Sequence, residues 1–166
     1  MSPHKHNFSS LSANMEDYLE TIYLQENQGN TAKVKSIAKA MNVSKPSVTE
    51  ALSILKDRGL VIHQKYGDVE LTEKGKEVAG NIYYRHCLFF SFFYKVLKIP
   101  PELAEDDACK IEHLVSNVTV QRFSAFMKVI NNMTDYNGKY AGFLDSVYDE
   151  IEKYNQDKLS LKEGCL

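Results

Sequence analysis

The sequence predicts a mainly α-helical protein in which a winged helix-turn-helix domain precedes a second, helical domain. Three observations predict this fold. Apolar residues recur every three or four positions over most of the chain, as they do in amphipathic helices. Two short helical segments, 34–41 and 45–58, are separated by a brief turn, and two strand-like runs within 60–72 follow them directly. Helical patterning then resumes and is interrupted at Pro100 and Pro101.

Length and composition fit one or two small domains. The chain has 166 residues, of which 43% are hydrophobic, so it can form real cores without disulfides. The net charge is −2, which by itself neither favours nor excludes a nucleic-acid partner. The charge distribution is more informative, because residues 31–76 hold nine Lys or Arg against five Asp or Glu, whereas residues 99–166 hold seven against twelve. A basic region followed by an acidic one suggests two separate roles.

Cysteine usage and hydropathy indicate a cytoplasmic protein. Three widely spaced cysteines, Cys87, Cys109 and Cys165, do not form a disulfide framework, and they fit a reducing compartment. The start of the chain is polar and does not resemble a signal peptide. The most apolar stretch, 87–99, is too short to span a bilayer.

The first elements are a polar arm and a helix. Residues 1–12 are expected to form a flexible arm, and a first helix is predicted over about 14–27, with Ser12 or Asn14 as its N-cap. The sequence NQGN ends this helix. One apolar face is predicted for it, made of Met15, Tyr18, Leu19, Ile22 and Tyr23.

The helix-turn-helix and its wing come next. After a turn at Asn42 and Val43, Ser44 is a natural N-cap, and Pro46 is acceptable in the first turn of the helix that follows. That helix stops at Arg58-Gly59. The two strand-like runs flank a turn at 66–68, and a β-hairpin directly after a helix-turn-helix is the feature called a wing.

Four further helices are predicted towards the carboxyl end, over about 73–97, 101–117, 119–132 and 140–155. The predicted domains are the arm (1–12), the winged helix-turn-helix (13–75), a helical domain (76–133) and a helical tail (134–166).

A helix-turn-helix reads double-stranded DNA by laying its second helix in the major groove. The small polar residues at the start of that helix suit base or phosphate contacts, and nearby lysines suit phosphates. The order of the elements favours DNA binding over a solvated basic face, and a dimer on a two-fold operator is expected. The predicted DNA-binding residues are Lys33, Lys35, Ser44, Lys45, Pro46, Ser47, Thr49, Glu50, Lys56, Lys65 and Tyr66.

A second group of residues has metal-binding chemistry. In DACKIEHL (107–114), Cys109 is followed three and four residues later by Glu112 and His113, so the three side chains share one helix face. Thiolate, carboxylate and imidazole all bind divalent transition metals. Asp17 and Glu20 share a face of the first helix, and His86 lies on the long helix; each is ordinary alone, and the hypothesis rests on their convergence.

Several segments of the chain resemble one protein family. MEDYLETIY, SVTEALSILKDRGLV, VELTEKGKEVA, YRH and DACKIEH, in that order over about residues 12–133, are similar to the diphtheria-toxin-repressor superfamily, which includes iron-dependent repressors and manganese transport regulators. The resemblance implies that residues 76–133 form a metal-binding and dimerisation domain. It also implies a regulator in which metal clamps the first helix against that domain and thereby sets the separation of two DNA-binding heads. The SH3-like third domain of longer members is not expected.

Carried over position by position, the resemblance implies a mixed ligand set. Asp17 is typical of manganese regulators, whereas Cys109 is typical of the toxin-repressor branch. Phe90 and Glu105 stand where iron repressors carry ancillary ligands Glu and His, so a manganese-type cluster of two ions fits better. Fe²⁺ and Mn²⁺ both suit the donors, with other divalent metals expected to bind in vitro. The implied ligands are Asp17, Glu20, His86, Cys109, Glu112 and His113.

The resulting hypothesis is a metal-dependent repressor of metal-uptake genes, not an enzyme. A winged-helix regulator that senses redox or a partner protein through Cys109 is the alternative. A di-metal enzyme is less favoured, because such sites repeat Glu-x-x-His on two helices. Dimerisation is expected through apolar residues of the helices that follow Pro101: Leu103, Ile111, Leu114, Val115, Val118, Val120, Phe123 and Phe126.

Overall fold

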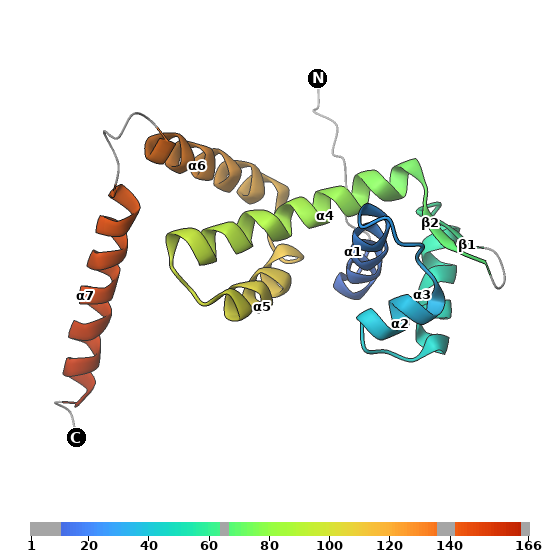
Figure 1. Ribbon diagram of the computed structural model, residues 1–166, viewed down its shortest axis with the longest axis horizontal. Helices are drawn as coiled ribbons and strands as arrows, with labels where there is room; N and C mark the ends of the chain where they lie inside the picture. Colours follow the sequence, from blue (N-terminus) through green and yellow to red (C-terminus); the bar gives the residue numbers. More distant parts are fainter. Residues whose placement is uncertain (1–10, 64–66, 136–141, 164–166) are drawn as a thin grey trace. The chain divides into compact units, whose positions relative to one another are not determined.

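The structure is a computed structural model that describes residues 11–63, 67–135 and 142–163 (Figure 1). The described residues form seven α-helices, one π-helical segment and one two-stranded sheet, which confirms the mainly α-helical fold. The chain divides by packing into two units, residues 1–84 and 85–166, and each has its own apolar core. Residues 1–10 of the expected arm lie outside the described residues.

Helix α1, Ala13–Asn27, forms as predicted and is anchored in the core of the amino-terminal unit. Tyr18, Leu19 and Ile22 are at most 2% exposed. Ser12 is the N-cap residue, although its backbone carbonyl, rather than its side chain, accepts the bonds from the first turn. Near the other end of α1, the Glu26 carboxylate accepts a 2.8 Å hydrogen bond from the backbone N–H of Leu71. This bond ties α1 to the hairpin.

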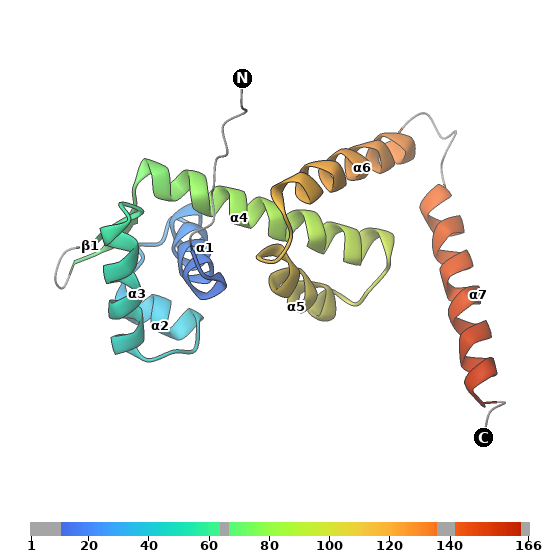
Figure 2. The ribbon, with the colours of Figure 1, turned by 180° about the vertical axis from the view of Figure 1, so that it is seen from behind.

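The helix-turn-helix consists of α2, Val34–Ala40, and α3, Lys45–Asp57, which lie side by side in both ribbon views (Figures 1 and 2). The tight turn between them places Asn42 at a φ of 55°, a left-handed conformation that asparagine tolerates. Ser44 caps α3 as predicted, since its Oγ accepts a hydrogen bond from Ser47 N at 3.3 Å. One face of α3 is buried in the core: Val48, Ala51, Leu52 and Leu55.

The predicted wing is present as the antiparallel pair β1, Val61–His63, and β2, Val69–Leu71. Val61 pairs with Leu71, and both side chains point into the core, while Ile62 is 52% exposed. The backbone N–H of Val69 also donates to Ala32 O at 2.8 Å, which joins the hairpin to the segment before α2. The tip of the wing, residues 64–66, lies outside the described residues.

Helix α4, Glu73–Ser91, is shorter than the predicted 73–97, because Phe92–Val96 (η1) continue it as a π-helical turn. In this wider turn Phe92 packs edge-on against Phe123 with 4.9 Å between ring centroids, so aromatic packing accompanies the departure from α-helical geometry. Val78, Ala79 and Ile82 of α4 belong to the first core. Other residues of the same helix, Leu88 and Phe89, belong to the second core.

The carboxyl-terminal unit adds α5, Pro101–Glu112, α6, Asn117–Asp135, and α7, Phe143–Glu163. Helix α5 ends five residues before the predicted residue 117, and His113 is its C-cap. The reason is that Ser116 caps the next helix: its Oγ accepts a bond from Thr119 N at 3.3 Å. Helix α6 is longer than the predicted 119–132, and α7 is displaced towards the carboxyl end relative to the predicted 140–155. Among the described helices, none is long and apolar enough to cross a membrane.

Candidate metal centre and nucleic-acid interface

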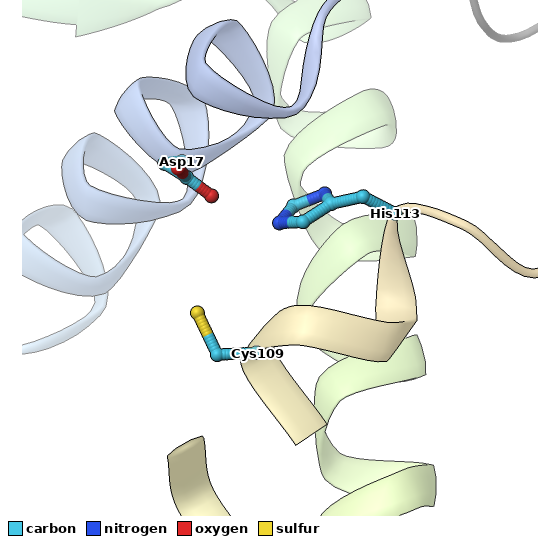
Figure 3. A group of neighbouring side chains, drawn as sticks. All are labelled: Asp17, Cys109 and His113. Carbon is cyan, nitrogen blue, oxygen red and sulfur yellow. The ribbon is translucent and has the colours of Figure 1, made fainter. Parts of the chain in front are cut away.

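The last two turns of α5 carry the candidate ligands of DACKIEHL. Cys109 and His113 are four residues apart, and their side chains extend from the same side of α5 (Figure 3). The Sγ atom of Cys109 and a ring nitrogen of His113 lie within 4.8 Å of each other. Cys109 is exposed, whereas the His113 side chain is only 7% exposed. A thiol and an imidazole at this separation suit a divalent transition metal.

Glu112 is the centre of this cluster. Its side chain is fully buried, with His86 Nδ1 at 2.9 Å from Oε2 and His113 Nε2 at 3.3 Å from Oε1. Among the described residues, Oε1 has no hydrogen-bond partner of good geometry. A buried carboxylate is unfavourable unless a positive charge or hydrogen bonds compensate it. A buried acid between two imidazoles therefore fits a cation site, and the donor types present are those a divalent transition metal takes.

Helix α4 contributes the second imidazole. The His86 side chain is 12% exposed, and its Nδ1 contacts Glu112. Its Nε2 lies 3.2 Å from Oε1 of Glu105, which is on the same face of α5 as Cys109. The ring stacks on Phe90, with centroids 6.4 Å apart and planes 8° from parallel. Arg85, the residue before His86, donates to the backbone carbonyl of Glu112 at 3.4 Å. The α4 side of the cluster is thus a fixed arrangement of packed and hydrogen-bonded groups.

Asp17 and Glu20 belong to the amino-terminal unit, on α1. They are three residues apart, so they share a face of the helix, and both are partly buried. Figure 3 labels Asp17 on its helix. Tyr18 lies between them in sequence but packs into the core, and burial, followed by the negative charge of Glu50, raises its pKa. Carboxylate oxygens such as these are donors that a hard cation takes.

Of the six predicted ligands, the structure brings four together within the carboxyl-terminal unit: His86, Cys109, Glu112 and His113. Two further residues of this cluster were absent from the predicted set. The sequence singles out Glu105 only as an ancillary position of iron repressors, although Glu105 precedes Cys109 by four residues and so shares its face of α5. Arg85 carries no comparable signal, since its contact with the end of α5 depends on how two helices pack.

The predicted recognition surface is the exposed start of α3. All six predicted residues of this helix and its cap are exposed, because the opposite face is buried in the core: Ser44, Lys45, Pro46, Ser47, Thr49 and Glu50. The hydroxyls of Ser44 and Ser47 lie 2.8 Å apart, and Thr49 donates to the Lys45 carbonyl at 3.0 Å. These internal bonds order the side chains on a surface suited to a DNA groove.

The flanking lysines differ in their surroundings. Lys35 is exposed on α2, while Lys33 pairs with Asp68 at 3.6 Å and Lys56 donates to His63 O at 3.1 Å. These two lysines therefore link the helices to the wing, and a phosphate would compete with those contacts. Lys65 and Tyr66, the predicted contacts at the tip of the wing, lie outside the described residues.

A winged helix-turn-helix joined to a helical domain with clustered thiol, carboxylate and imidazole groups defines a class, the metal-responsive transcription regulators. Comparison with known families makes this specific. The model for the iron dependent repressor N-terminal DNA binding domain matches residues 10–69, and that for the iron dependent repressor metal binding and dimerisation domain matches residues 72–136. The chain belongs to this family of metal-dependent transcriptional repressors. The di-metal enzyme is thereby excluded.

Individual relatives agree with the family assignment. The chain is 34% identical over 119 residues to an uncharacterized HTH-type transcriptional regulator of Methanocaldococcus jannaschii. The match covers 71% of this chain and 95% of that protein. It is 31% identical to the HTH-type transcriptional regulator MntR of Bacillus subtilis, over 86% of this chain and 96% of MntR. The solved structure of the manganese regulator SloR matches with a TM-score of 0.63 and 33% identity, over 71% of this chain. The chain spans 55% of the SloR chain, about half its length.

Proposed function

We propose that the chain is a repressor that binds operator DNA as a homodimer when Mn²⁺ or Fe²⁺ is bound. The observation that carries this proposal is Glu112, a fully buried carboxylate with an imidazole nitrogen near each oxygen. Such a group is better suited to coordinating a cation than to stabilising an apolar core. The proposed ligands are Asp17, Glu20, His86, Cys109, Glu112 and His113.

The donor set is compatible with either metal. Three carboxylates and two imidazoles suit Mn²⁺ and Fe²⁺, whereas the Cys109 thiolate favours a softer or later metal. Manganese is supported by the relatives, because SloR is described as a manganese regulator. Two ions are proposed because Phe90 and Glu105 stand where iron repressors carry ancillary ligands, so the resemblance favours the two-ion cluster of manganese regulators. When bound, the metal supplies positive charge and a cross-link, and the protein supplies the donors that select it.

The switch follows from which elements carry the ligands. Without metal, the carboxylates of Asp17, Glu20 and Glu112 would repel one another if brought close. An ion held by α1 and by α5 removes that repulsion and favours one arrangement of the two units. The ion shifts the equilibrium only by its differential affinity for that arrangement. The arrangement would present the two α3 helices of a dimer at the spacing of an operator.

The dimer interface is proposed on the outer faces of α5 and α6. Four of the eight predicted interface residues are largely exposed in the single chain, with exposed fractions of 48% to 82%: Leu103, Leu114, Val118 and Phe126. The other four are buried in the second core or packed against it: Ile111, Val115, Val120 and Phe123. We therefore propose that only the four exposed residues contribute to the dimer interface. Exposed apolar side chains of this size are commonly covered by a partner.

Metal dependence of operator binding tests the proposed function. We expect the full-length dimer to bind its operator at least tenfold more tightly in Mn²⁺ or Fe²⁺ than in chelator, because metal selects the DNA-binding arrangement. A band-shift titration at fixed salt, with each metal in turn, measures this. Equal affinity in chelator and in every metal would contradict the proposal.

The recognition surface is tested separately by Lys45→Ala. Loss of one phosphate contact should weaken binding to all DNA sequences and reduce the slope of log affinity against log salt by about one. The measurement is fluorescence anisotropy with metal-saturated protein at several salt concentrations. Lys128→Ala, on α6 of the other unit, is the matched control and should leave both affinity and slope unchanged.

The domain boundaries and cellular location belong to the same proposal. We assign DNA binding to residues 13–75, metal binding and dimerisation to 76–133, and the remaining helical tail to 134–166. Packing supports a boundary between the two domains within α4, between residues 84 and 85, because Val78, Ala79 and Ile82 belong to the first core. The relatives come from Methanocaldococcus jannaschii and Bacillus subtilis, prokaryotes whose operator DNA lies in the cytoplasm, and we assign the chain to the same compartment.

A further inference from the structure

The imidazole of His86 lies between two carboxylates of α5. Nδ1 is 2.9 Å from Oε2 of Glu112, and Nε2 is 3.2 Å from Oε1 of Glu105. Glu105 and Glu112 are seven residues apart, which is close to two helical turns, so one face of α5 presents both to the ring. The two carboxylates differ sharply in environment, because the Glu112 side chain is fully buried and that of Glu105 is 61% exposed.

This arrangement determines which ring nitrogen can bind an ion. A neutral imidazole has one nitrogen that carries a proton and one with a free lone pair, and only the second can coordinate a metal. An ion bound to Glu112 would be on the Nδ1 side of the ring, because Nδ1 is the ring nitrogen that lies 2.9 Å from Glu112 Oε2. The proton must then reside on Nε2, which needs a hydrogen-bond acceptor, and Glu105 supplies one at 3.2 Å.

We propose that Glu105 is a positioning residue that holds His86 in the Nε2–H tautomer and makes Nδ1 the metal ligand. This inference rests on the proposed metal centre and adds a residue outside the proposed ligand set. Glu105 does not itself coordinate the ion, because the two ring nitrogens point away from each other and Glu105 lies on the edge opposite Glu112. A hydrogen bond from the distal nitrogen to a carboxylate also makes the ligating nitrogen more basic.

The packing around the ring supports a fixed orientation. Phe90, one turn after His86 on α4, stacks on the imidazole with planes 8° from parallel. This contact restricts rotation of the ring out of its plane but does not distinguish one edge from the other. Glu105 and Glu112 lie at different ring nitrogens and therefore distinguish the two edges. Glu105 selects the tautomer, and Phe90 limits the ring to the plane in which that choice is effective.

The test uses full-length protein labelled with ¹⁵N-histidine and loaded with Zn²⁺, a diamagnetic probe. In the wild type, the ¹⁵N signals of His86 should show a protonated Nε2 and a metal-bound Nδ1. Glu105→Leu removes the acceptor, and it should weaken Zn²⁺ binding roughly tenfold in a chelator competition, the lower end of what loss of such a partner causes. Glu105→Gln retains an acceptor oxygen and should recover most of the affinity and the wild-type ring signals.

Asp106→Asn is the matched control. Asp106 is the next residue on α5, its side chain is 61% exposed like that of Glu105, and it accepts a hydrogen bond from Lys110 instead of facing His86. This variant should bind Zn²⁺ as the wild type does. A metal-bound Nε2 in the wild type, or equal Zn²⁺ affinity in Glu105→Leu and Asp106→Asn, would overturn the positioning role while leaving the metal centre intact. Absence of any Zn²⁺ binding by the wild type would overturn the metal centre itself.

Discussion

Replacement of Gly75 by alanine is expected to destabilise the winged helix-turn-helix unit by roughly 3 kcal/mol, a large effect for a surface helix terminus. A Cβ atom at this position would lie 1.9 Å from the backbone oxygen of Leu60. That oxygen cannot move away freely, because it accepts a hydrogen bond from Thr72 N at 3.0 Å and Leu60 itself is buried. Relief of the clash would require the start of α4 to move away from β1, with loss of the bond from Gly75 N to the Thr72 hydroxyl.

Gly80→Ala provides the matched control for this prediction. Gly80 also lies in α4, but a Cβ there would meet the Tyr23 side chain at ordinary contact distances, with the hydroxyl nearest at 3.5 Å. Alanine should stabilise this position by about 0.5–1 kcal/mol through helix propensity. Thermal unfolding followed by circular dichroism in chelator should give a Tm at least ~10 °C lower for Gly75→Ala and slightly higher for Gly80→Ala. Similar Tm values for the two variants would show that the approach of Leu60 is not a real constraint.

Glu112→Gln is expected to remove the metal response while leaving a folded protein. Glutamine has the same shape as glutamate, but it lacks the charge that would hold the ion between His86 and His113. Loss of a direct ligand should weaken Mn²⁺ binding by more than about 100-fold, beyond the 10–100-fold typical of residues that only support ligands. Without metal the variant should be at least as stable as the wild type, because a buried carboxylate is unfavourable.

The stabilisation caused by Mn²⁺ distinguishes a loss of metal binding from a change in the stability of the metal-free protein. At a Mn²⁺ concentration 100 times the wild-type Kd, metal should stabilise the wild type by about 2.7 kcal/mol and the variant by no more than about 0.4 kcal/mol. Differential scanning calorimetry with Mn²⁺ and with chelator measures both values. Glu102→Gln makes the same chemical change at an exposed position of α5, and it should behave as the wild type does. Persistence of the full Mn²⁺ stabilisation in Glu112→Gln would remove Glu112 from the ligand set.

The fold was accessible from local sequence signals, and the errors lie where distant packing decides. Ser44 and Pro46 mark the start of α3 because capping and proline geometry are local effects, and the structure has both as predicted. The end of α5 was placed five residues too late, since Ile111, Leu114 and Val115 continue an apolar helical pattern. The competing local signal was the cap at Ser116, which begins α6 instead. The π-helical turn at Phe92–Val96 is accompanied by a ring contact between Phe92 and Phe123, which local sequence signals do not reveal.

The candidate metal centre was likewise predictable only in part. Helical spacing alone places Cys109, Glu112 and His113 together, because i, i+3 and i+4 positions share a face. Spacing cannot show that Glu112 is fully buried or that His86 lies between Glu105 and Glu112, since both depend on how α4 packs against α5. The apolar residues of α5 and α6 were likewise indistinguishable in sequence, although half of them are core residues and half are exposed.

The anchoring of α1 has a mechanical consequence. The helix that bears Asp17 and Glu20 is fastened on its inner side by Tyr18, Leu19 and Ile22, and at its far end by the bond from Leu71 to Glu26. Within its own unit this helix is firmly packed. A displacement of α1 would therefore also displace α3 and the wing, which share its core. An ion bound to the α1 carboxylates would move the winged helix-turn-helix unit as one body.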